Sequence, residues 1–465
     1  MLHVRGVVVL AVMTLTACGW NGESTRRAER PVLTQELILD NGLKIVVRED
    51  RRAPVVVSQI WYKVGASDEP DGLTGIAHVF EHMMFKGTTR YPSGEFSRII
   101  AENGGRENAF TGPDYTAYFQ QLEKSRLGVA LALEADRMQN LIIDEQEFKK
   151  EIKVVMEERR LRTDDQPEAL AFEHFMATAF TTHSYKNPII GWMRDLERLT
   201  VADLRAWYKQ WYVPSNATLV VVGDVTPSEV FALARRHFGA IPAARAVRNG
   251  LPAEPAQTAT RRSRLKAPAQ VPSLFMGFHV PVFDGQDSVE PYALLVLTGV
   301  LDGGHSARFS RELVRGQEIA AGINTGYTPT ARHPGLFTLS ATPAAKHNVR
   351  ELETAILAQL RRVQNEPVAR EELERVKAQV AASSVFARDS VFYQAMQMGM
   401  LETVGLRWQR LDEYIERLRA VTPEQLQAVA RKYLVETNMT VTVLEPEPGK
   451  RAPRAPATVG GRHGR

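Results

Sequence analysis

The sequence predicts an α+β protein built from two homologous domains. Its length of 465 residues exceeds what one hydrophobic core usually holds and favours two domains of roughly 200 residues each. Short apolar runs typical of strands alternate with longer stretches of helical periodicity along both halves. A segment that ends the first half, residues 199–222, recurs at the end of the second half as residues 421–444. A duplicated domain explains these three observations together.

Both copies of this segment read as a helix, a short turn and a buried strand, at a constant offset of 222 residues. The match contains no gap and closes two halves of similar size, which indicates duplication. We therefore place the first domain at residues 33–242 and the second at residues 272–447. The linker between them, residues 243–271, is rich in Ala, Pro, Arg and Gln. The matched residues are Thr200 with Thr422, Leu204 with Leu426, Asn216 with Asn438 and Thr218 with Thr440.

The first residues have the composition of a targeting segment. Residues 1–17 combine Arg5 with an apolar run too short for a permanent membrane helix, and we predict a signal peptide. They end in Leu-Thr-Ala before Cys18, which resembles a bacterial lipobox with cleavage before Cys18 and lipidation of that residue. The alternative is a plain secretory signal with an incidental cysteine. Residues 18–32 are polar and read as a flexible tether.

The predicted location follows from the residue after the cysteine. Gly19 stands there instead of Asp, which by resemblance favours a lipid-anchored protein on the periplasmic side of the bacterial outer membrane. Cys18 is the single cysteine, so no intrachain disulfide can form. The basic tail, residues 448–465, is predicted to be disordered. It holds five Lys and Arg residues. The whole chain has a formal net charge of +4, so the chain without the five charges of the tail has a net charge of 4 − 5 = −1. The charge therefore gives no support to a nucleic-acid partner.

The first half begins with strands. Asn41-Gly42 between two apolar runs is a strong hairpin signal, and the next run is apolar on both faces, as in a central strand. A helix containing two histidines follows. The predicted strands are 33–39, 43–47, 54–64 and 115–120, and the predicted helices are 94–103, 127–141 and 144–163.

The second half repeats this alternation without the histidine motif. It is predicted to open with a strand at 273–280 and a helix from Pro291, followed by strands at 319–327 and 336–341 and helices as far as Leu434.

The histidine helix carries metal-ligand spacing. His78 and His82 lie at i and i+4 on one helix face, so both imidazoles can reach one ion. Glu81 lies on the same side and is placed to take a proton from a water molecule at the metal. The pattern His-x-x-Glu-His is the inverted form of the zincin motif. The alternative is a helix with two unrelated polar histidines.

Helical phase selects a third ligand from the helix at 144–163. Glu158 and Glu151 lie along its inward-facing stripe, whereas Glu157 points elsewhere. A carboxylate on such a stripe is costly unless it meets a cation or a metal. We therefore predict Glu158 as the ligand and Glu151 as a supporting acid. The alternative is that residues 157–160, Glu-Glu-Arg-Arg, are only a solvated charge run.

At this point the motif Gly75-x-x-His78-x-x-Glu81-His82-Met-x-Phe-x-Gly87-Thr88 resembles the pitrilysin/insulinase family of zinc metallopeptidases, the inverzincins. It is most similar to the branch containing mitochondrial processing peptidase. The resemblance covers nearly all of residues 33–445. It implies that each domain has a mixed, largely antiparallel sheet with packed helices, and that two chains form a dimer around a chamber. Other matching positions are Glu151-x6-Glu158, Asn108-Ala109-x-Thr111, Thr116-x-Tyr118 and His183-x-Tyr185-x-x-Pro188-x-x-Gly191.

The resemblance also implies roles for single residues. It implies Zn²⁺ held by two histidines and a glutamate, with a second glutamate as general base. It places Asn108 and Ala109 on an edge strand that binds an extended peptide through its backbone. The alternative for Asn108 is a turn residue after Gly104-Gly105. The predicted zinc ligands are His78, His82 and Glu158, the base is Glu81 and the auxiliary acid is Glu151.

One departure from the family limits this expectation. Its catalytic chains usually carry an Arg and a Tyr, seven residues apart, in the second half, and these bind the substrate carbonyl and its developing oxyanion. Ala321 stands where the Tyr would fall, and Tyr327 is out of register. Without such donors the rate should fall on the order of a hundredfold or more. We therefore expect a dimer with a companion chain of the same fold that supplies the pair, although a homodimer remains an alternative.

Three functions remain open at the sequence level. The first is a zinc-dependent endopeptidase that hydrolyses peptides or unfolded protein segments. The second is a non-catalytic scaffold, like the core subunits of respiratory complex III, and the third is a protein that binds peptides without cutting them. The intact set of His78, Glu81, His82 and Glu158 favours the first.

Overall fold

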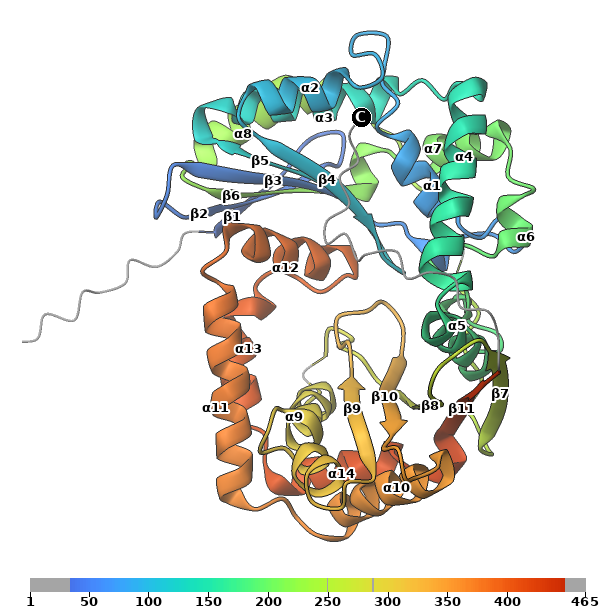
Figure 1. Ribbon diagram of the computed structural model, residues 1–465. Helices are drawn as coiled ribbons and strands as arrows, with labels where there is room; N and C mark the ends of the chain where they lie inside the picture. Colours follow the sequence, from blue (N-terminus) through green and yellow to red (C-terminus); the bar gives the residue numbers. More distant parts are fainter. Residues whose placement is uncertain (1–33, 249, 287, 448–465) are drawn as a thin grey trace, which may run out of the picture.

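The computed structural model describes residues 34–248, 250–286 and 288–447, which form two halves, each with one β-sheet (Figure 1). The predicted signal peptide, the lipidation residue Cys18, the tether and the basic tail lie outside the described residues. Among the described helices, none combines the length and the apolar composition needed to cross a bilayer.

The first sheet has six strands in the order β1-β2-β6-β3-β5-β4. The pair β2 and β6 is parallel and the other neighbours are antiparallel, so the sheet is mixed and largely antiparallel, as expected. The central strand β3 is buried along seven of its eight residues, which explains its continuous apolar run. The strands are β1 Thr34–Ile38, β2 Lys44–Glu49, β3 Val55–Tyr62, β4 Arg106–Thr111, β5 Thr116–Glu123 and β6 Ala217–Gly223.

The second sheet has five strands in the order β7-β11-β8-β10-β9. Its one parallel pair, β7 with β11, corresponds to the parallel pair β2 with β6. The second sheet therefore repeats the strand order of the first, except that none of its described strands is equivalent to β1. This confirms the duplicated α+β fold. The strands are β7 Arg261–Ala267, β8 Ser273–Val280, β9 Ala320–Gly326, β10 Gly335–Pro343 and β11 Met439–Pro446.

The offset of 222 residues holds for whole elements. Helices α7 and α14 begin and end at positions related by that offset, and so do the single 3₁₀ turns that follow them. Both helices start with the same capping box, in which Thr200 or Thr422 accepts a hydrogen bond from the backbone three residues later. The duplication therefore extends to the side chains that begin each helix.

The predicted linker is wrong over residues 261–267, which form the edge strand β7. Its side chains alternate between exposed Arg262, Arg264 and Lys266 and more buried neighbours. An edge strand is held by backbone pairing with one neighbour and tolerates charged side chains, so its composition resembles that of a loop.

The helices match the predicted stretches. The two longest of the first half are α3 and α4. Helix α3 contacts strands β3 and β5, whereas α4 contacts helices α1 and α6 and continues into one π-helical turn at Arg160–Asp164. The helices of the first half are α1 Ile76–Met83, α2 Glu95–Glu102, α3 Leu127–Asn140, α4 Glu145–Arg159, α5 Pro167–Ala179, α6 Met193–Leu196, α7 Val201–Trp211 and α8 Pro227–Phe238. Those of the second half are α9 Glu290–Asp302, α10 Val349–Asn365, α11 Arg370–Ala387, α12 Val391–Thr403, α13 Arg410–Arg419 and α14 Pro423–Tyr433.

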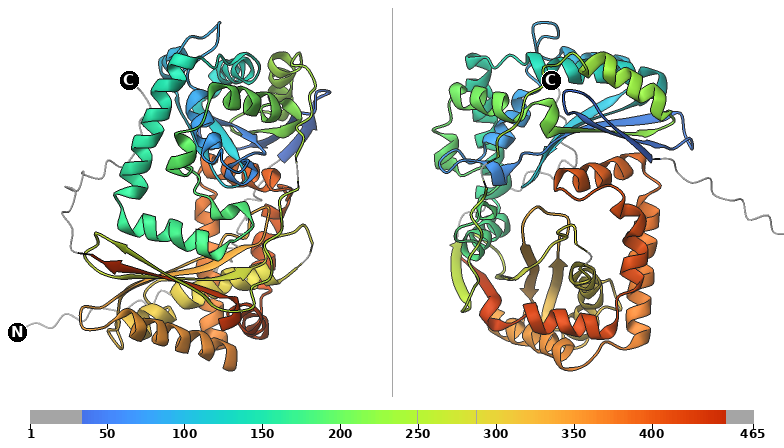
Figure 2. Two further views of the ribbon diagram at one scale, coloured as in Figure 1. Left: turned by 90° about the vertical axis from the view of Figure 1, so that its right-hand side faces the viewer. Right: turned by 180° about the vertical axis from the view of Figure 1, so that it is seen from behind.

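The two halves exchange helices. Helix α5 of the first half packs on β7, β8 and β11 of the second sheet, whereas α12 of the second half packs on β3 and β6 of the first sheet (Figures 1 and 2). Gly399 permits the close approach of α12, because a Cβ there would lie 2.1 Å from Nε1 of Trp61. Each sheet therefore has one face covered by its own helices and part of the other face covered by its partner half.

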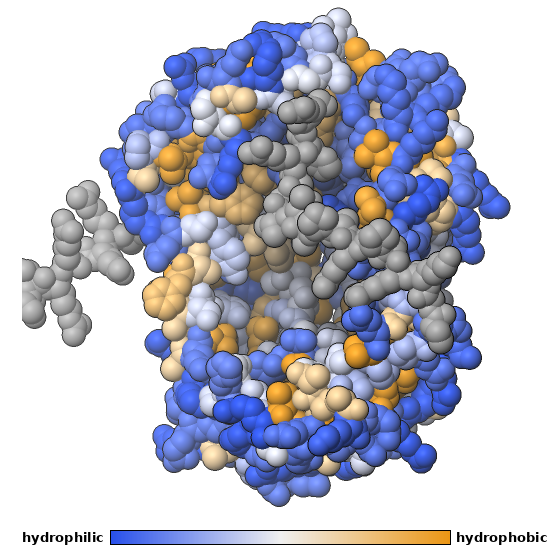
Figure 3. Space-filling model, viewed as in Figure 1, coloured by the Kyte–Doolittle hydropathy of each residue, from blue (hydrophilic) through white to orange (hydrophobic). Residues whose placement is uncertain are grey.

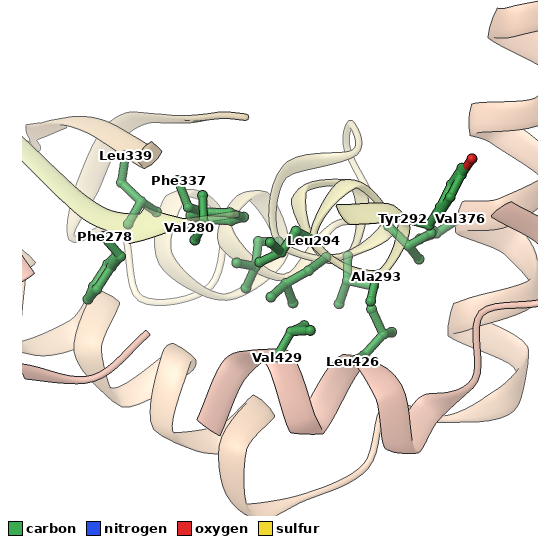
Figure 4. Packing of buried hydrophobic residues seen from close by; sticks show 14 of the residues in the cluster. Phe278, Val280, Tyr292, Ala293, Leu294, Phe337, Leu339, Val376, Leu426 and Val429 are labelled. Atoms are coloured by element: carbon green, nitrogen blue, oxygen red, sulfur yellow. The ribbon is translucent and has the colours of Figure 1, made fainter. Parts of the chain in front are cut away.

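The hydrophobic cores follow this arrangement. In the second half, Phe278 and Phe337 of the sheet, Leu294 of α9 and Val429 of α14 belong to one buried hydrophobic cluster (Figure 4). A separate cluster lies between the first sheet and its own helices. The face between the two halves is hollowed (Figure 3).

Candidate metal centre

Helix α1 is fixed at its start by backbone contacts. Its first residue follows Gly75, which has φ +88° and lies against Gly191; a Cβ on Gly75 would be 2.9 Å from the Gly191 Cα. The carboxylate of the buried Glu69 accepts hydrogen bonds of 2.9 Å from the backbone nitrogens of Gly75 and Ala77. Glycine at both motif positions is therefore required by this close approach, which sets the direction of α1.

His78, His82 and Glu158 converge where α1 crosses α4. Oε2 of Glu158 lies 3.9 Å from Nε2 of His78 and 3.6 Å from Nε2 of His82, and one ligand atom from each residue lies within 4.8 Å of the others. Zinc bonds of about 2.0–2.2 Å in tetrahedral geometry would place such atoms roughly 3.3–3.5 Å apart. Two nitrogens and one oxygen at nearly this spacing fit a zinc site with a fourth position for water. Within the described residues this is the one group of three such ligands.

Glu151 positions His82. Its Oε1 lies 2.8 Å from Nδ1 of His82, and its Oε2 lies 2.5 Å from Nζ of Lys86. Burial raises the pKa of Glu151, but the hydrogen bonds from His82 and Lys86 outweigh it and lower the pKa to about 2. An ionised carboxylate at Nδ1 keeps the proton there and turns Nε2 toward Glu158. Glu151 thus contacts a predicted metal ligand, as a supporting acid would, and its role as an auxiliary catalytic acid stays a prediction.

Glu81 lies beside the cluster and is only 5% exposed. Thr111 of β4 donates a hydrogen bond of 2.5 Å to its Oε2. Burial raises the pKa of Glu81 above that of an ordinary glutamate, against the lowering effect of the Thr111 hydrogen bond. A carboxylate with a raised pKa, held at the edge of a cavity, has the properties of a general base.

The charged residues at the end of α4 lie on different faces of the helix, as helical phase predicts. Glu157 is exposed and pairs with Arg160 at 3.1 Å, whereas Glu158 faces the histidines. Arg159 is buried and binds Glu173 through hydrogen bonds of 2.8 and 2.9 Å. The interpretation of these residues as a solvated charge run is therefore wrong for Glu158 and Arg159.

A cavity of about 660 Å³ joins this cluster to the edge strand β4. Asn108 and Ala109 line it from β4, so the interpretation of Asn108 as a turn residue is wrong. The backbone nitrogen of Ala109 donates to Oδ1 of its neighbour Asn108 at 2.9 Å. Since β4 pairs only with β5 among the described strands, its other edge faces the cavity region and can accept another strand.

In the described part of the second half, no tyrosine takes the place of the missing oxyanion donor. Ala321 is an exposed residue of β9. Tyr327 is engaged elsewhere, because its hydroxyl donates to the carbonyl of Pro281 at 2.6 Å.

In the sequence analysis, no contact is assigned to three side chains that bind carboxylates at this site. Lys86 binds Glu151, Arg162 binds Oε1 of Glu158 at 2.6 Å, and Thr111 binds Glu81. A signal existed for two of them, because Lys86 follows His82 by four residues and Arg162 follows Glu158 by four residues. The contact of Thr111 depends on the packing of β4 and has no local signal.

Comparison with known proteins agrees with this geometry. Residues 44–192 match the family model "Insulinase (Peptidase family M16)", and residues 198–380 match "Peptidase M16 inactive domain". The chain is 30% identical over 419 residues to the zinc protease PqqE of Helicobacter pylori, covering 89% of this chain and 93% of that protein. It is 27% identical to the uncharacterized zinc protease YmxG of Bacillus subtilis, covering 85% of this chain and 94% of that protein.

Solved structures show the same fold. A crystal structure of a protease from Helicobacter pylori superimposes with a TM-score of 0.85 and 29% identity, covering 89% of this chain and all of that one. The periplasmic protease PqqL from Escherichia coli gives a TM-score of 0.76 at 20% identity, and the match covers 90% of this chain but 48% of PqqL.

Proposed function

Because the chain belongs to the insulinase (M16) family of peptidases, we propose that it is a zinc-dependent endopeptidase acting on peptides or unfolded protein segments. The observation that carries this proposal is the cluster of His78, His82 and Glu158 beside the buried Glu81, in a cavity bordered by an unpaired strand edge. The relatives named as zinc proteases support it.

Each of these side chains has a task in peptide hydrolysis. A zinc ion held by the two histidines and Glu158 would polarise the scissile carbonyl and lower the pKa of a water molecule. Glu81, with Oε2 held by Thr111, accepts the proton of the attacking water and passes it to the leaving amine. Glu151 and Lys86 keep His82 in the ligating orientation.

The substrate binds in an extended form beside β4. Backbone pairing with the free edge of β4 aligns a peptide with the cluster without reading each side chain. The side chain of Asn108 would have to release the Ala109 nitrogen for that pairing. Such a mode favours flexible or unfolded segments, because a folded protein does not offer a free strand.

We further propose that a companion chain of the same fold completes the site, as a hetero- or homodimer. The missing Arg and Tyr, with Ala321 in the place of the Tyr, support a companion that supplies oxyanion donors. The match covers 48% of PqqL, which leaves length for a second unit of similar size in that polypeptide and supports a companion here.

We also propose a location for the enzyme. The lipobox-like segment before Cys18 supports a lipid anchor, and Gly19 supports the periplasmic side of the outer membrane. Labelling with a palmitate analogue, compared between the wild-type chain and C18A, tests the anchor; label on both would contradict it.

The variant Glu81→Gln tests the function. It should bind zinc as the wild type does but lose cleavage of an unfolded model protein, measured with a companion chain present. Glu157→Gln, at an exposed position, is the matched control and should cleave normally. Cleavage retained by E81Q would contradict the role of Glu81.

A second candidate is a protein that captures peptides without cutting them, and the absence of the Arg and Tyr pair favours it. Stoichiometric zinc and peptide binding, with no turnover even beside a companion chain, would establish this alternative. A native protein without zinc would favour a non-catalytic scaffold instead.

A further inference from the structure

The lining of the metal cavity outside β4 includes a group of apolar side chains beside polar ones. Of the large apolar side chains left exposed in the described residues, Phe172 at 44% and Ile189 at 36% both line this cavity. Single exposed apolar residues are common on protein surfaces, but two that line one concave site are not explained by chance exposure.

Helix α5 builds one part of the wall that carries this group, and residues 185–190 build the other. Ala169, Phe172, Glu173 and Met176 follow the spacing i, i+3, i+4 and i+7, so one face of α5 looks into the cavity. The one acid on that face, Glu173, is already bound by both guanidinium nitrogens of Arg159. The wall therefore offers no free carboxylate to a substrate.

Phe172 is also supported from behind. It lines a second hollow of about 200 Å³ on the second sheet, together with Phe175 and Phe275. The ring centroids of these three phenylalanines lie 5.9 to 6.3 Å apart, and Phe175 and Phe275 are buried. Gly277 makes room for this base, because a Cβ there would lie 2.5 Å from the Phe175 ring. The Phe172 ring thus stands on a packed aromatic base with one part open to the cavity.

A peptide paired with β4 points alternate side chains to opposite sides. One set would face α5 and the loop that carries Ile189. We propose that Phe172, Met176 and Ile189 form a specificity subsite that selects one large apolar side chain of the substrate, near the scissile bond. This inference rests on the proposed function, since it assumes a peptide in the metal cavity.

The test is equilibrium binding, which does not require cleavage. The zinc-loaded E81Q chain is titrated with fluorescein-labelled decapeptides of alternating Ala and Gln that carry one central Phe, Lys or Ala. A short repetitive peptide can shift its register along β4. The single Phe can therefore reach the subsite, whichever residue of β4 the subsite lies beside. The Phe peptide should bind on the order of ten- to a hundredfold more tightly than the Ala peptide.

Variants of Phe172 test the assignment. Phe172→Ala should remove most of the preference for Phe, Phe172→Leu should keep it, and Phe172→Asp should make the Lys peptide the preferred one. Phe386→Ala is the matched control, because Phe386 is 71% exposed on α11 and lines neither hollow. The zinc content of every variant is measured to show that the cluster is intact.

The outcomes separate the two proposals. A preference for Phe that is the same in F172A and F172D overturns the subsite. Cleavage of unfolded protein without any dependence on apolar residues also overturns the subsite but leaves the peptidase in place. If neither binding nor cleavage occurs with any peptide, the subsite and the proposed function both fail.

Discussion

The contact between α1 and α4 in the first half and the contact between α9 and α11 in the second half occupy equivalent places in a duplicated fold. In the first, histidines of α1 meet Glu158 of α4. In the second, Gly299 of α9 meets Val376 and Val380 of α11, and a Cβ on that glycine would lie 2.6 Å from Val376. Val376 and Val380 thus stand in the contact of the second half where α4 of the first half presents Glu158 to α1. One helix pair is thus held by polar groups suited to a metal, and the other by close apolar packing.

The two helix pairs differ in what holds them together. The apolar pair shows that this topology needs no ion to bring the two helices together. Polar groups at the same place in the first half are costly to bury unless a metal or charge partner meets them. In the first half, Lys86 and Arg162 are such charge partners, because they bind the carboxylates of Glu151 and Glu158.

The largest expected effect comes from giving α4 of the first half an apolar residue like those that α11 presents in the second half. Glu158→Val should lower zinc affinity by about a thousandfold, since one of three protein ligands that share roughly 10–16 kcal/mol of binding free energy is lost. Isothermal titration with zinc measures this, and circular dichroism should show an intact fold. Zinc affinity within threefold of the wild type would show that Glu158 is no ligand.

The reverse exchange tests the second half. Val376→Glu places a carboxylate against Gly299 without a cation and should lower the free energy of unfolding by about 3–5 kcal/mol, the cost of an uncompensated buried charge. Val376→Ile, which keeps the site apolar, is the control. Denaturant unfolding followed by circular dichroism measures both, and equal stability of V376E and V376I would contradict the comparison.

A smaller effect is expected from the groups that position His82. Lys86→Met removes the cation that holds Glu151 and should weaken zinc binding about 10–100-fold. Lys153→Met, on the exposed side of α4, should leave zinc affinity unchanged. Equal zinc affinity in K86M and K153M would mean that Lys86 contributes nothing to the site.

The smallest change in stability is expected at the helix caps, which are the same in the two halves. Thr200 and Thr422 cap α7 and α14 with the same geometry, so Thr200→Ala and Thr422→Ala should each cost about 1 kcal/mol of stability. Costs that differ by more than about 1 kcal/mol, measured by denaturant unfolding, would mean that the two caps are not equivalent in energy.

Much of the fold could be predicted from local patterns. The hairpin at Asn41-Gly42, the buried strand β3 and the repeated element from Thr200 to β6 all follow from periodicity and turn chemistry. The phase of α4 separates Glu158 from Glu157, because a helix places neighbouring residues about 100° apart. These features depend on residues close together in the chain.

The remaining features depend on contacts between distant residues. The exchange of α5 and α12 between the sheets has no local signal, nor does the contact of Thr111 with Glu81. Strand β7 falls within the predicted linker because backbone pairing at a sheet edge leaves no apolar pattern. The role of Phe172 depends on the cavity that α5 forms with β4.

The contact between α1 and α4 is predicted to hold a single zinc ion, whereas its counterpart in the second half is predicted to hold none. Anomalous diffraction at the zinc absorption edge, from crystals of the full chain, tests this prediction directly. We predict one peak, about 2.0–2.2 Å from Nε2 of His78, Nε2 of His82 and a carboxylate oxygen of Glu158. Zinc bound elsewhere, or a protein loaded with zinc but without a peak at these three residues, would contradict this metal site.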